Sequence, residues 1–89
     1  MAVIGAKWTV LIIRDLMAGP RRFGQLLASL RGVSPTTLSR RLRWLEGEGI
    51  CSRRSYDEVP PRVEYRLTGK GEALAAIVET MRAWGERYT

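Results

Sequence analysis

Apolar residues in the middle of the chain recur at helical spacing, because Leu38, Leu42 and Leu45 fall on one side. Ser34 precedes them and is a favourable N-cap, and Gly49 is the expected left-handed residue just past the end of the helix. The opposite and flanking sides carry hydroxyl and guanidinium groups, from Thr36, Thr37, Ser39, Arg40 and Arg43. The pattern predicts an amphipathic helix over about residues 34–48, whose polar face suits a DNA major groove as well as plain solvent.

Two helices are expected before this one. Residues 3–17 have an apolar face broad enough to be buried on more than one side, and Gly19-Pro20 ends the helix. Residues 21–30 form a second, short helix, followed by a turn that contains Gly32. Two short helices joined by such a turn, the second basic on its outside, are typical of a helix-turn-helix.

Two strands are expected after the helix-turn-helix, over residues 50–56 and 62–67. In the second strand, apolar and charged residues alternate, whereas the alternation in the first is ambiguous. The Pro60-Pro61 pair belongs to the loop between them, outside the ladder. A β-hairpin placed here, about residues 50–67, corresponds to the wing of a winged helix.

A last helix is predicted over about residues 69–88, with Thr68 as N-cap. Its apolar stripe runs over several turns, further than a small neighbouring core can cover. We interpret the outer part of the stripe as a dimer surface shared with the first helix. The alternative is a helix that folds back on its own core.

The predicted fold class is mainly α with a small β-hairpin (α+β), a single winged helix-turn-helix DNA-binding domain over residues 1–89. The net charge is +6, and 13 of the 15 basic residues are Arg. Residues 18–45 contain six Arg and no acidic residue. This segment is a candidate surface for a polyanion. Genomic base composition explains an excess of Arg over Lys equally well.

The chain has one cysteine and no histidine, which leaves no disulfide within it and no usual zinc site. No nucleophile–base pair is evident, so an enzyme is not expected, nor any cofactor or metal. The apolar run Val10–Ile13 is too short to span a membrane, and the start does not resemble a signal peptide. We therefore expect a cytoplasmic protein in a reducing environment, with no membrane partner.

Several motifs resemble those of the HxlR-type winged helix-turn-helix transcriptional regulators of bacteria and archaea. The most specific is the run PPRVEY at residues 60–65. The other matching segments are Gly5–Trp8, Gly19–Phe23, Leu42–Glu46 with Gly49-Ile50, Leu67-Thr68 with Gly71, and Trp84-Gly85. The resemblance covers nearly the whole chain. It implies a homodimer that binds a palindromic operator through its recognition helices and pairs through its first and last helices.

Two features depart from the family pattern. Many members have a cysteine a few residues ahead of the motif that Gly5–Trp8 matches, and in some it senses oxidants or electrophiles. No such residue precedes the motif in this chain. Either that segment lies outside the chain or this mode of sensing is absent, and an effector of unknown identity stays open. Trp44 stands where a charged residue is usual, so the rim of the recognition helix is expected to pack differently.

The residues are assigned the following roles. The expected groove contacts are Thr36, Thr37, Ser39, Arg40 and Arg43. The expected contacts to the DNA backbone are Arg21, Arg22, Arg53 and Arg62. The expected dimer interface comprises Ile4, Trp8, Leu11, Ile77, Met81, Trp84 and Tyr88. Arg62 could instead be held by Glu64 or an acid of the loop, and Arg41 is expected in a structural ion pair. Cys51 is interpreted as a buried, inert thiol, with a sensor role as the alternative.

The leading functional hypothesis is a dimeric, sequence-specific DNA-binding transcriptional regulator. The alternative is a winged-helix module that binds another protein through its apolar helices, its Arg residues serving only solubility. Binding to random duplex DNA at low salt distinguishes the two.

Overall fold

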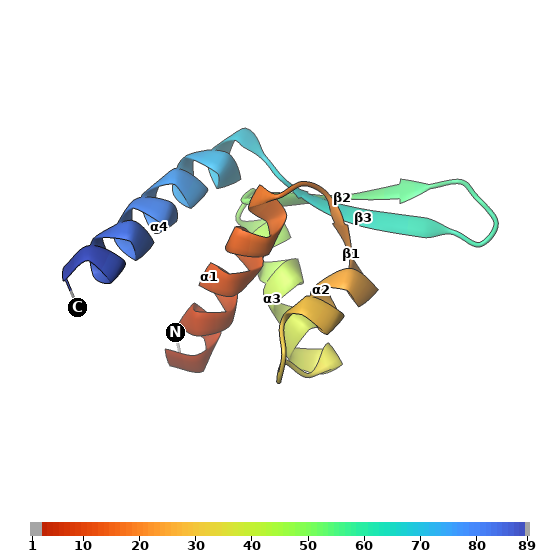
Figure 1. Cartoon of the computed structure of the whole chain (residues 1–89). Coiled ribbons are helices and arrows are strands. Elements are labelled where there is room, and N and C mark those ends of the chain that lie inside the picture. Colours follow the sequence, from red (N-terminus) through yellow and green to blue (C-terminus); the bar gives the residue numbers. More distant parts are fainter. Residues whose placement is uncertain (1–2, 89) are drawn as a thin grey trace.

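The computed structural model describes residues 3–88, and their side chains from residue 7 onward. The elements in chain order are α1 (Val3–Met17), β1 (Arg21–Arg22), α2 (Phe23–Ser29), α3 (Pro35–Gly47), β2 (Cys51–Tyr56), β3 (Arg62–Leu67) and α4 (Gly69–Tyr88). The helices α1, α2 and α3 gather in one group, from which the β2–β3 hairpin and α4 project in opposite directions (Figure 1). This arrangement separates two surfaces, one on α3 and the hairpin and the other on α4.

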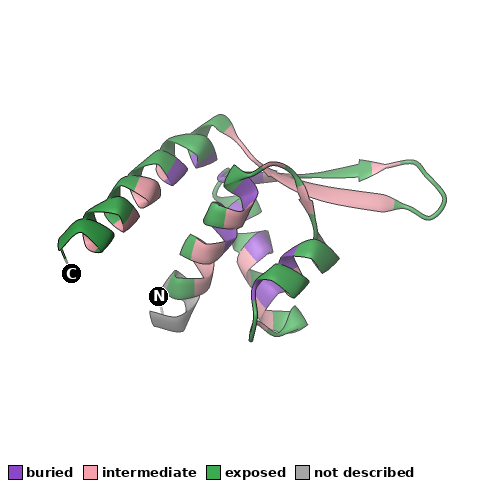
Figure 2. Ribbon diagram, viewed as in Figure 1, coloured by how far each residue is buried: buried purple, intermediate pink, exposed green. Residues whose placement is uncertain are grey.

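The core lies among the first three helices and reaches the base of the hairpin (Figure 2). Its centre is formed by the leucine stripe of α3, which meets the buried side of α1 and the short helix α2. The buried apolar residues are Ile12, Ile13, Leu16, Leu26, Leu30, Leu38, Leu42, Leu45, Ile50, Cys51 and Ala75. Because α4 contributes only Ala75 to this set, most of that helix is free of the core.

The region around Arg21 and Arg22 corrects the sequence prediction of a helix over residues 21–30. These two residues form β1, which pairs antiparallel with β3 through Arg21 opposite Tyr65 and Arg22 opposite Glu64. The helix is shorter than predicted and begins at Phe23, with the Arg22 N–H donating to Gln25 Oε1 at 2.8 Å. The small sheet therefore has three strands in the order β1-β3-β2, where only a hairpin was expected.

Both ends of α3 are capped as the sequence predicts. Ser34 Oγ accepts a hydrogen bond from the Thr37 N–H at 3.1 Å. At the other end, the Ile50 N–H donates to the Leu45 carbonyl at 2.9 Å and the Gly49 N–H to the Glu46 carbonyl at 3.0 Å. This pair of bonds is a Schellman motif, and it requires the left-handed φ of +74° that glycine supplies at position 49. The caps fix where the helix starts and where the chain leaves it.

The start of α4 is tied to the end of α3. Thr68 Oγ1 accepts a hydrogen bond from the Gly71 N–H at 3.0 Å, which confirms Thr68 as the N-cap. The same hydroxyl donates to the Gly49 carbonyl at 2.5 Å. Lys70 Nζ donates to the Glu48 carbonyl at 2.6 Å. These contacts join the proposed recognition helix to the last helix through a few short bonds.

The register of the hairpin resolves the ambiguous alternation of its first strand. Cys51 is paired with Leu67 and Arg53 with Tyr65, so these residues share one face of the sheet. At the base of that face the Cys51 side chain is buried, while Arg53, nearer the tip, is exposed. The hairpin is thus anchored at its base and free along most of its length.

Candidate nucleic-acid interface

The outer face of α3 presents the residues that the sequence assigned to the groove. Thr36, Arg40 and Arg43 are exposed, and Ser39 is half-buried. These four side chains line a shallow hollow of about 440 Å³ together with Phe23 and Pro35. The helix backbone therefore brings hydroxyl and guanidinium groups together on one surface, where α2 and α3 meet.

Arg40 and Arg43 are available for a ligand. Among the residues that the structure describes, neither has a carboxylate within 4.0 Å. An Arg without a partner can offer its planar set of N–H donors to guanine O6 and N7 or to phosphate. Thr37 differs, because its Oγ1 accepts a hydrogen bond from the Ser34 hydroxyl at 2.9 Å and its side chain is half-buried. Thr37 therefore supports the cap of α3 and lies outside the hollow.

Arg41 was predicted to form a structural ion pair, and the structure corrects this. No carboxylate of the described chain lies within 4.0 Å of it. Its guanidinium carbon instead stands 6.0 Å from the centre of the Trp44 ring. The physical reason is the i,i+3 spacing on one helix, which places the two side chains side by side. This contact also gives Trp44 a packing role at the rim of α3.

The wing holds Arg62 in place, as the alternative assignment anticipated. Arg62 Nη2 lies 3.1 Å from Glu58 Oε1, and its guanidinium carbon is 4.1 Å from the centre of the Tyr56 ring. Glu58 therefore does not present an unpaired charge at the tip, which reduces its repulsion of phosphate. To contact DNA, Arg62 would have to share or leave this ion pair, worth at most about 1 kcal/mol at a surface.

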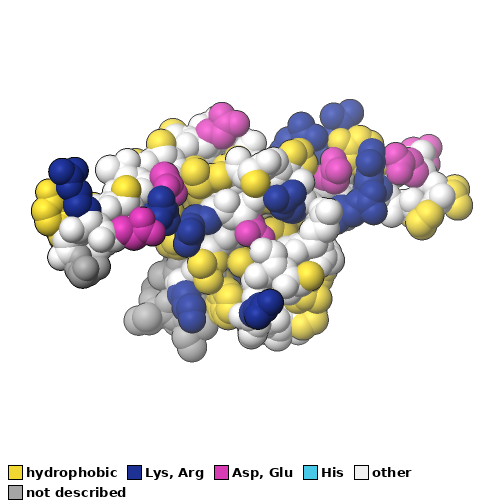
Figure 3. Space-filling model, viewed as in Figure 1, with side chains coloured by type: hydrophobic (Ala, Val, Ile, Leu, Met, Phe, Trp, Pro, Cys, Tyr) yellow, Lys and Arg dark blue, Asp and Glu magenta, His cyan; other side chains and the backbone are white. Residues whose placement is uncertain are grey.

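Four other basic residues of the sheet are less constrained than Arg62. Arg22, Arg53 and Arg54 are exposed, and Arg21 is half-buried. Basic side chains gather over the hairpin in Figure 3, with acidic side chains close to them. Arg54, on the same wing as Arg53 and Arg62, has its guanidinium carbon 5.0 Å from the centre of the Tyr56 ring. It precedes Tyr56 by two positions on the same side of the strand, which brings the two side chains together.

Cys51 is buried, as predicted, with 2% of its surface exposed. Its thiol faces the Leu42 carbonyl, with 4.0 Å between sulfur and oxygen. Burial, together with the negative charge of Glu46, raises the pKa of the Cys51 thiol to about 11. Since the thiolate is the reactive form, this environment opposes a role as a sensor.

The raised pKa of Cys51 predicts a loss of stability at high pH. The folded state keeps the proton to about pH 11, whereas the unfolded chain releases it near pH 9. The stabilisation is therefore complete below pH 9 and declines as the pH rises from 9 to 11. Relative to Cys51→Ala, the wild-type free energy of unfolding should fall by about 2 kcal/mol between pH 8 and pH 10.5. Urea titrations of both proteins at each pH measure this difference in the free energy of unfolding. A difference that is the same at pH 8 and pH 10.5 contradicts the prediction.

Two other kinds of site are absent from the described part of the chain. Within residues 3–88, no group of three or more His, Cys, Asp or Glu side chains is placed to hold a metal ion. None of the helices formed by these residues has both the length and the hydropathy that a membrane span requires.

The three helices, the turn between α2 and α3 and the hairpin define a winged helix-turn-helix protein. The chain belongs to the HxlR-like helix-turn-helix family, whose sequence model matches residues 3–89. It is 48% identical over 82 residues to an uncharacterised HTH-type transcriptional regulator of Synechocystis, covering 92% of this chain and 61% of that one. The family and such relatives are regulators rather than enzymes.

Solved structures agree with this assignment. The reduced form of the Bacillus subtilis transcriptional regulator YodB superposes with a TM-score of 0.85 at 39% identity, covering 96% of this chain and 83% of that one. A transcriptional regulator described as of the MarR family, from Enterococcus faecalis V583, gives a TM-score of 0.86 at 39% identity, covering 92% and 74%. The chain spans 61% of the length of the Synechocystis relative and 55% of that of a Mycobacterium tuberculosis relative.

Proposed function

We propose that this protein is a transcriptional regulator that binds double-stranded DNA, with α3 in the major groove. The observation that carries the proposal is the hollow on α3, where Arg40 and Arg43 stand exposed beside Thr36 and Ser39. The names of the relatives, which are HTH-type transcriptional regulators, support the same function. A protein of this function works where the chromosome is, which in a bacterial or archaeal cell is the cytoplasm.

The dependence of affinity on salt tests the proposal. A surface that neutralises about 6–10 phosphates per dimer loses about 10³–10⁵ in affinity between 50 and 200 mM salt. Fluorescence anisotropy with a labelled duplex, chosen from a random pool for tight binding, measures the slope. Absence of binding to any duplex at 50 mM salt contradicts the proposal and favours the protein-binding alternative.

We further propose that two copies pair through α1 and α4 and bind a palindromic operator. The support is an apolar stripe on α4 that the described part of the subunit leaves uncovered: Ile77, Met81, Trp84 and Tyr88 are each more than half exposed. Half-sites read by a symmetric dimer lie about one helical turn, or 34 Å, apart. Among the apolar side chains of α1 that the structure describes, Val10 and Met17 are the most exposed. Trp8 and Leu11, also assigned to the interface, pack against the subunit's own core.

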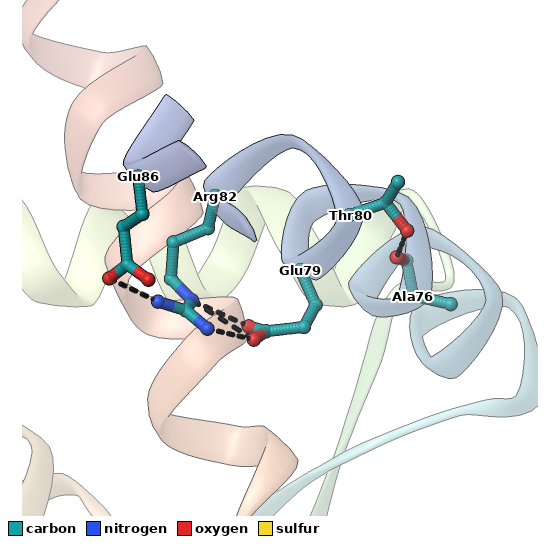
Figure 4. Close-up of polar contacts among 5 residues, drawn as sticks. All are labelled: Ala76, Glu79, Thr80, Arg82 and Glu86. Atoms are coloured by element: carbon teal, nitrogen blue, oxygen red, sulfur yellow. Dashed lines mark hydrogen bonds and ion pairs between the residues drawn. The ribbon is translucent and has the colours of Figure 1, made fainter. Parts of the chain in front are cut away.

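The side of α4 opposite the apolar stripe is polar, so the helix is amphipathic. Arg82 is bonded to both Glu79 and Glu86, one turn before and after it (Figure 4). The hydrogen bond from Arg82 lowers the pKa of Glu79, and the charge of Arg14 on α1 adds to this effect. Since this polar side faces α1, the apolar stripe is left for a second copy. Ile4, assigned to the same interface, lies outside the residues whose side chains the structure describes.

A charge placed on the stripe should separate the two copies. Met81→Glu puts a carboxylate into the proposed interface, where an unpaired charge is costly to bury. Sedimentation equilibrium at tens of micromolar should give a dimer for the wild type and a monomer for this variant. Ala83→Glu adds the same charge to an exposed position off the stripe and should stay dimeric. A monomeric wild type, or a dimeric Met81→Glu variant, contradicts this part of the proposal.

A further inference from the structure

A second hollow lies away from the proposed DNA-binding surface, where the end of α1, the end of β3 and the start of α4 meet. It has a volume of about 450 Å³, within the range of small-molecule sites. Most of its wall is apolar, formed by Leu16, Met17, Pro20, Leu67, Ala75 and Ala76. Alanines at two successive positions of α4 leave this space open, because they have no longer side chain to fill it.

Two charged residues also line the hollow, Arg66 and Glu72. They do not form an ion pair with each other, since no oxygen–nitrogen distance between them is within 4.0 Å. Arg66 already has partners outside the hollow. Its Nη2 donates to the Tyr56 hydroxyl at 3.4 Å and lies 3.9 Å from Glu64 Oε1.

Glu72 is the charge at this site that has no partner. Its side chain is exposed, and within residues 7–88 no cation lies within 4.0 Å of its carboxylate. The nearest basic residue in the sequence, Lys70, is bonded to the Glu48 carbonyl at the end of α3. With Arg66 held by Glu64 and the Tyr56 hydroxyl, the hollow is a mostly apolar cavity with the unpaired carboxylate of Glu72 at its edge.

We propose that this hollow binds a small amphipathic organic cation, with its apolar body against Leu16, Leu67 and Ala75 and its ammonium group on Glu72. An aromatic ring bearing a short aminoalkyl arm has this chemistry. Burial of the ring against apolar walls supplies most of the affinity. The partly exposed ion pair with Glu72 adds at most about 1 kcal/mol, or about fivefold.

The position of the hollow gives an occupant contact with two functional parts. It would touch α4, which is proposed to pair the two copies, and the end of β3, which continues into the wing. A bound ligand can therefore change the orientation of α4 relative to the wing. In the proposed dimer, this would change the distance between the two recognition helices. This consequence for regulation depends on the proposed function, whereas the binding itself does not and is measured without DNA.

Three naphthalene probes of one skeleton test the inference by isothermal titration calorimetry on the free protein: 1-naphthylmethylamine, 1-naphthalenemethanol and 1-naphthoate. The amine should bind about fivefold more tightly than the uncharged alcohol, and the carboxylate most weakly. Glu72→Gln should make the amine and the alcohol bind equally. Glu86→Gln removes the same charge from α4 outside the hollow and should leave the preference intact.

Several other results would contradict the proposed ligand site. Equal binding of the three probes to the wild type, or tighter binding of the carboxylate, shows that Glu72 does not select the ligand. No binding of any probe contradicts the site itself. Binding to the monomeric Met81→Glu variant but not to the wild type shows that the second copy fills the hollow. Ala76→Leu narrows the cavity from an exposed position of α4 without changing the charge. It should weaken binding of all three probes, and a variant that binds them as tightly as the wild type shows that they bind elsewhere.

Discussion

Replacing Arg40 and Arg43 with Ala is expected to remove the preference for operator DNA while the protein stays folded. Both side chains project from α3 without a partner in the described chain, so their loss leaves no buried group unsatisfied. Each Arg that pairs with a guanine contributes about 1–3 kcal/mol to discrimination against other bases. In a dimer the two substitutions remove four such contacts, and operator affinity should fall by about a thousandfold or more.

The matched control removes the same number of charges elsewhere. Arg14→Ala with Arg87→Ala keeps the net charge equal to that of the first variant, and both positions are exposed on other helices. Competition between operator and random duplexes, followed by anisotropy, measures the preference for each protein. The far-UV circular dichroism of both variants should match the wild type. Equal operator preference in the two variants would show that the reading surface lies elsewhere.

Gly71→Ala is expected to destabilise the fold by about 2–4 kcal/mol. A Cβ at this position would overlap the Ile50 carbonyl group and lie 3.0 Å from Leu67 Cδ2. The Ile50 carbonyl also accepts the Thr68 N–H at 3.1 Å, so it cannot move without loosening the cap of α4. The start of α4 is therefore packed against the chain that leaves α3, with no space for a methyl group.

Gly69→Ala is the control for this substitution. A Cβ at Gly69 has nothing within 4 Å, although the residue belongs to the same turn of α4. Its stability should stay within about 1 kcal/mol of the wild type, since Ala favours the helix more than Gly does. Thermal unfolding followed by circular dichroism compares the two, and a drop of roughly 10 °C or more is expected only for Gly71→Ala. Similar melting temperatures would mean that α4 can shift away from Ile50.

Local sequence signals predicted α3 and its surroundings well. The Ser34 cap, the leucine stripe and the left-handed Gly49 each depend on residues within one or two turns of the helix, and all three are confirmed. The order of the four helices and the hairpin, the winged helix-turn-helix fold and the family are confirmed as well. Such features can be predicted because periodicity and capping act over short distances along the chain.

Features that depend on distant partners were predicted less well. β1 exists because Arg21 and Arg22 pair with β3, more than 40 positions later, and two basic residues carry no strand signal of their own. The contact of Arg41 with Trp44 was missed because a charged residue near an apolar stripe was assumed to need an acid. Trp8 fits either a core or an interface by periodicity alone, and only the packing of α1 shows that the subunit's own core half-covers it.

A nuclear magnetic resonance titration of the labelled protein with its selected operator duplex tests the central proposal most directly. Binding through α3 predicts that the largest amide shifts lie at residues 36–43, with smaller ones at Arg53 and Arg54. Amides of residues 77–88, on the proposed dimer helix, should change little. Large shifts on α4 with an unchanged α3 would contradict the account, because the DNA would then occupy the surface proposed to pair two copies.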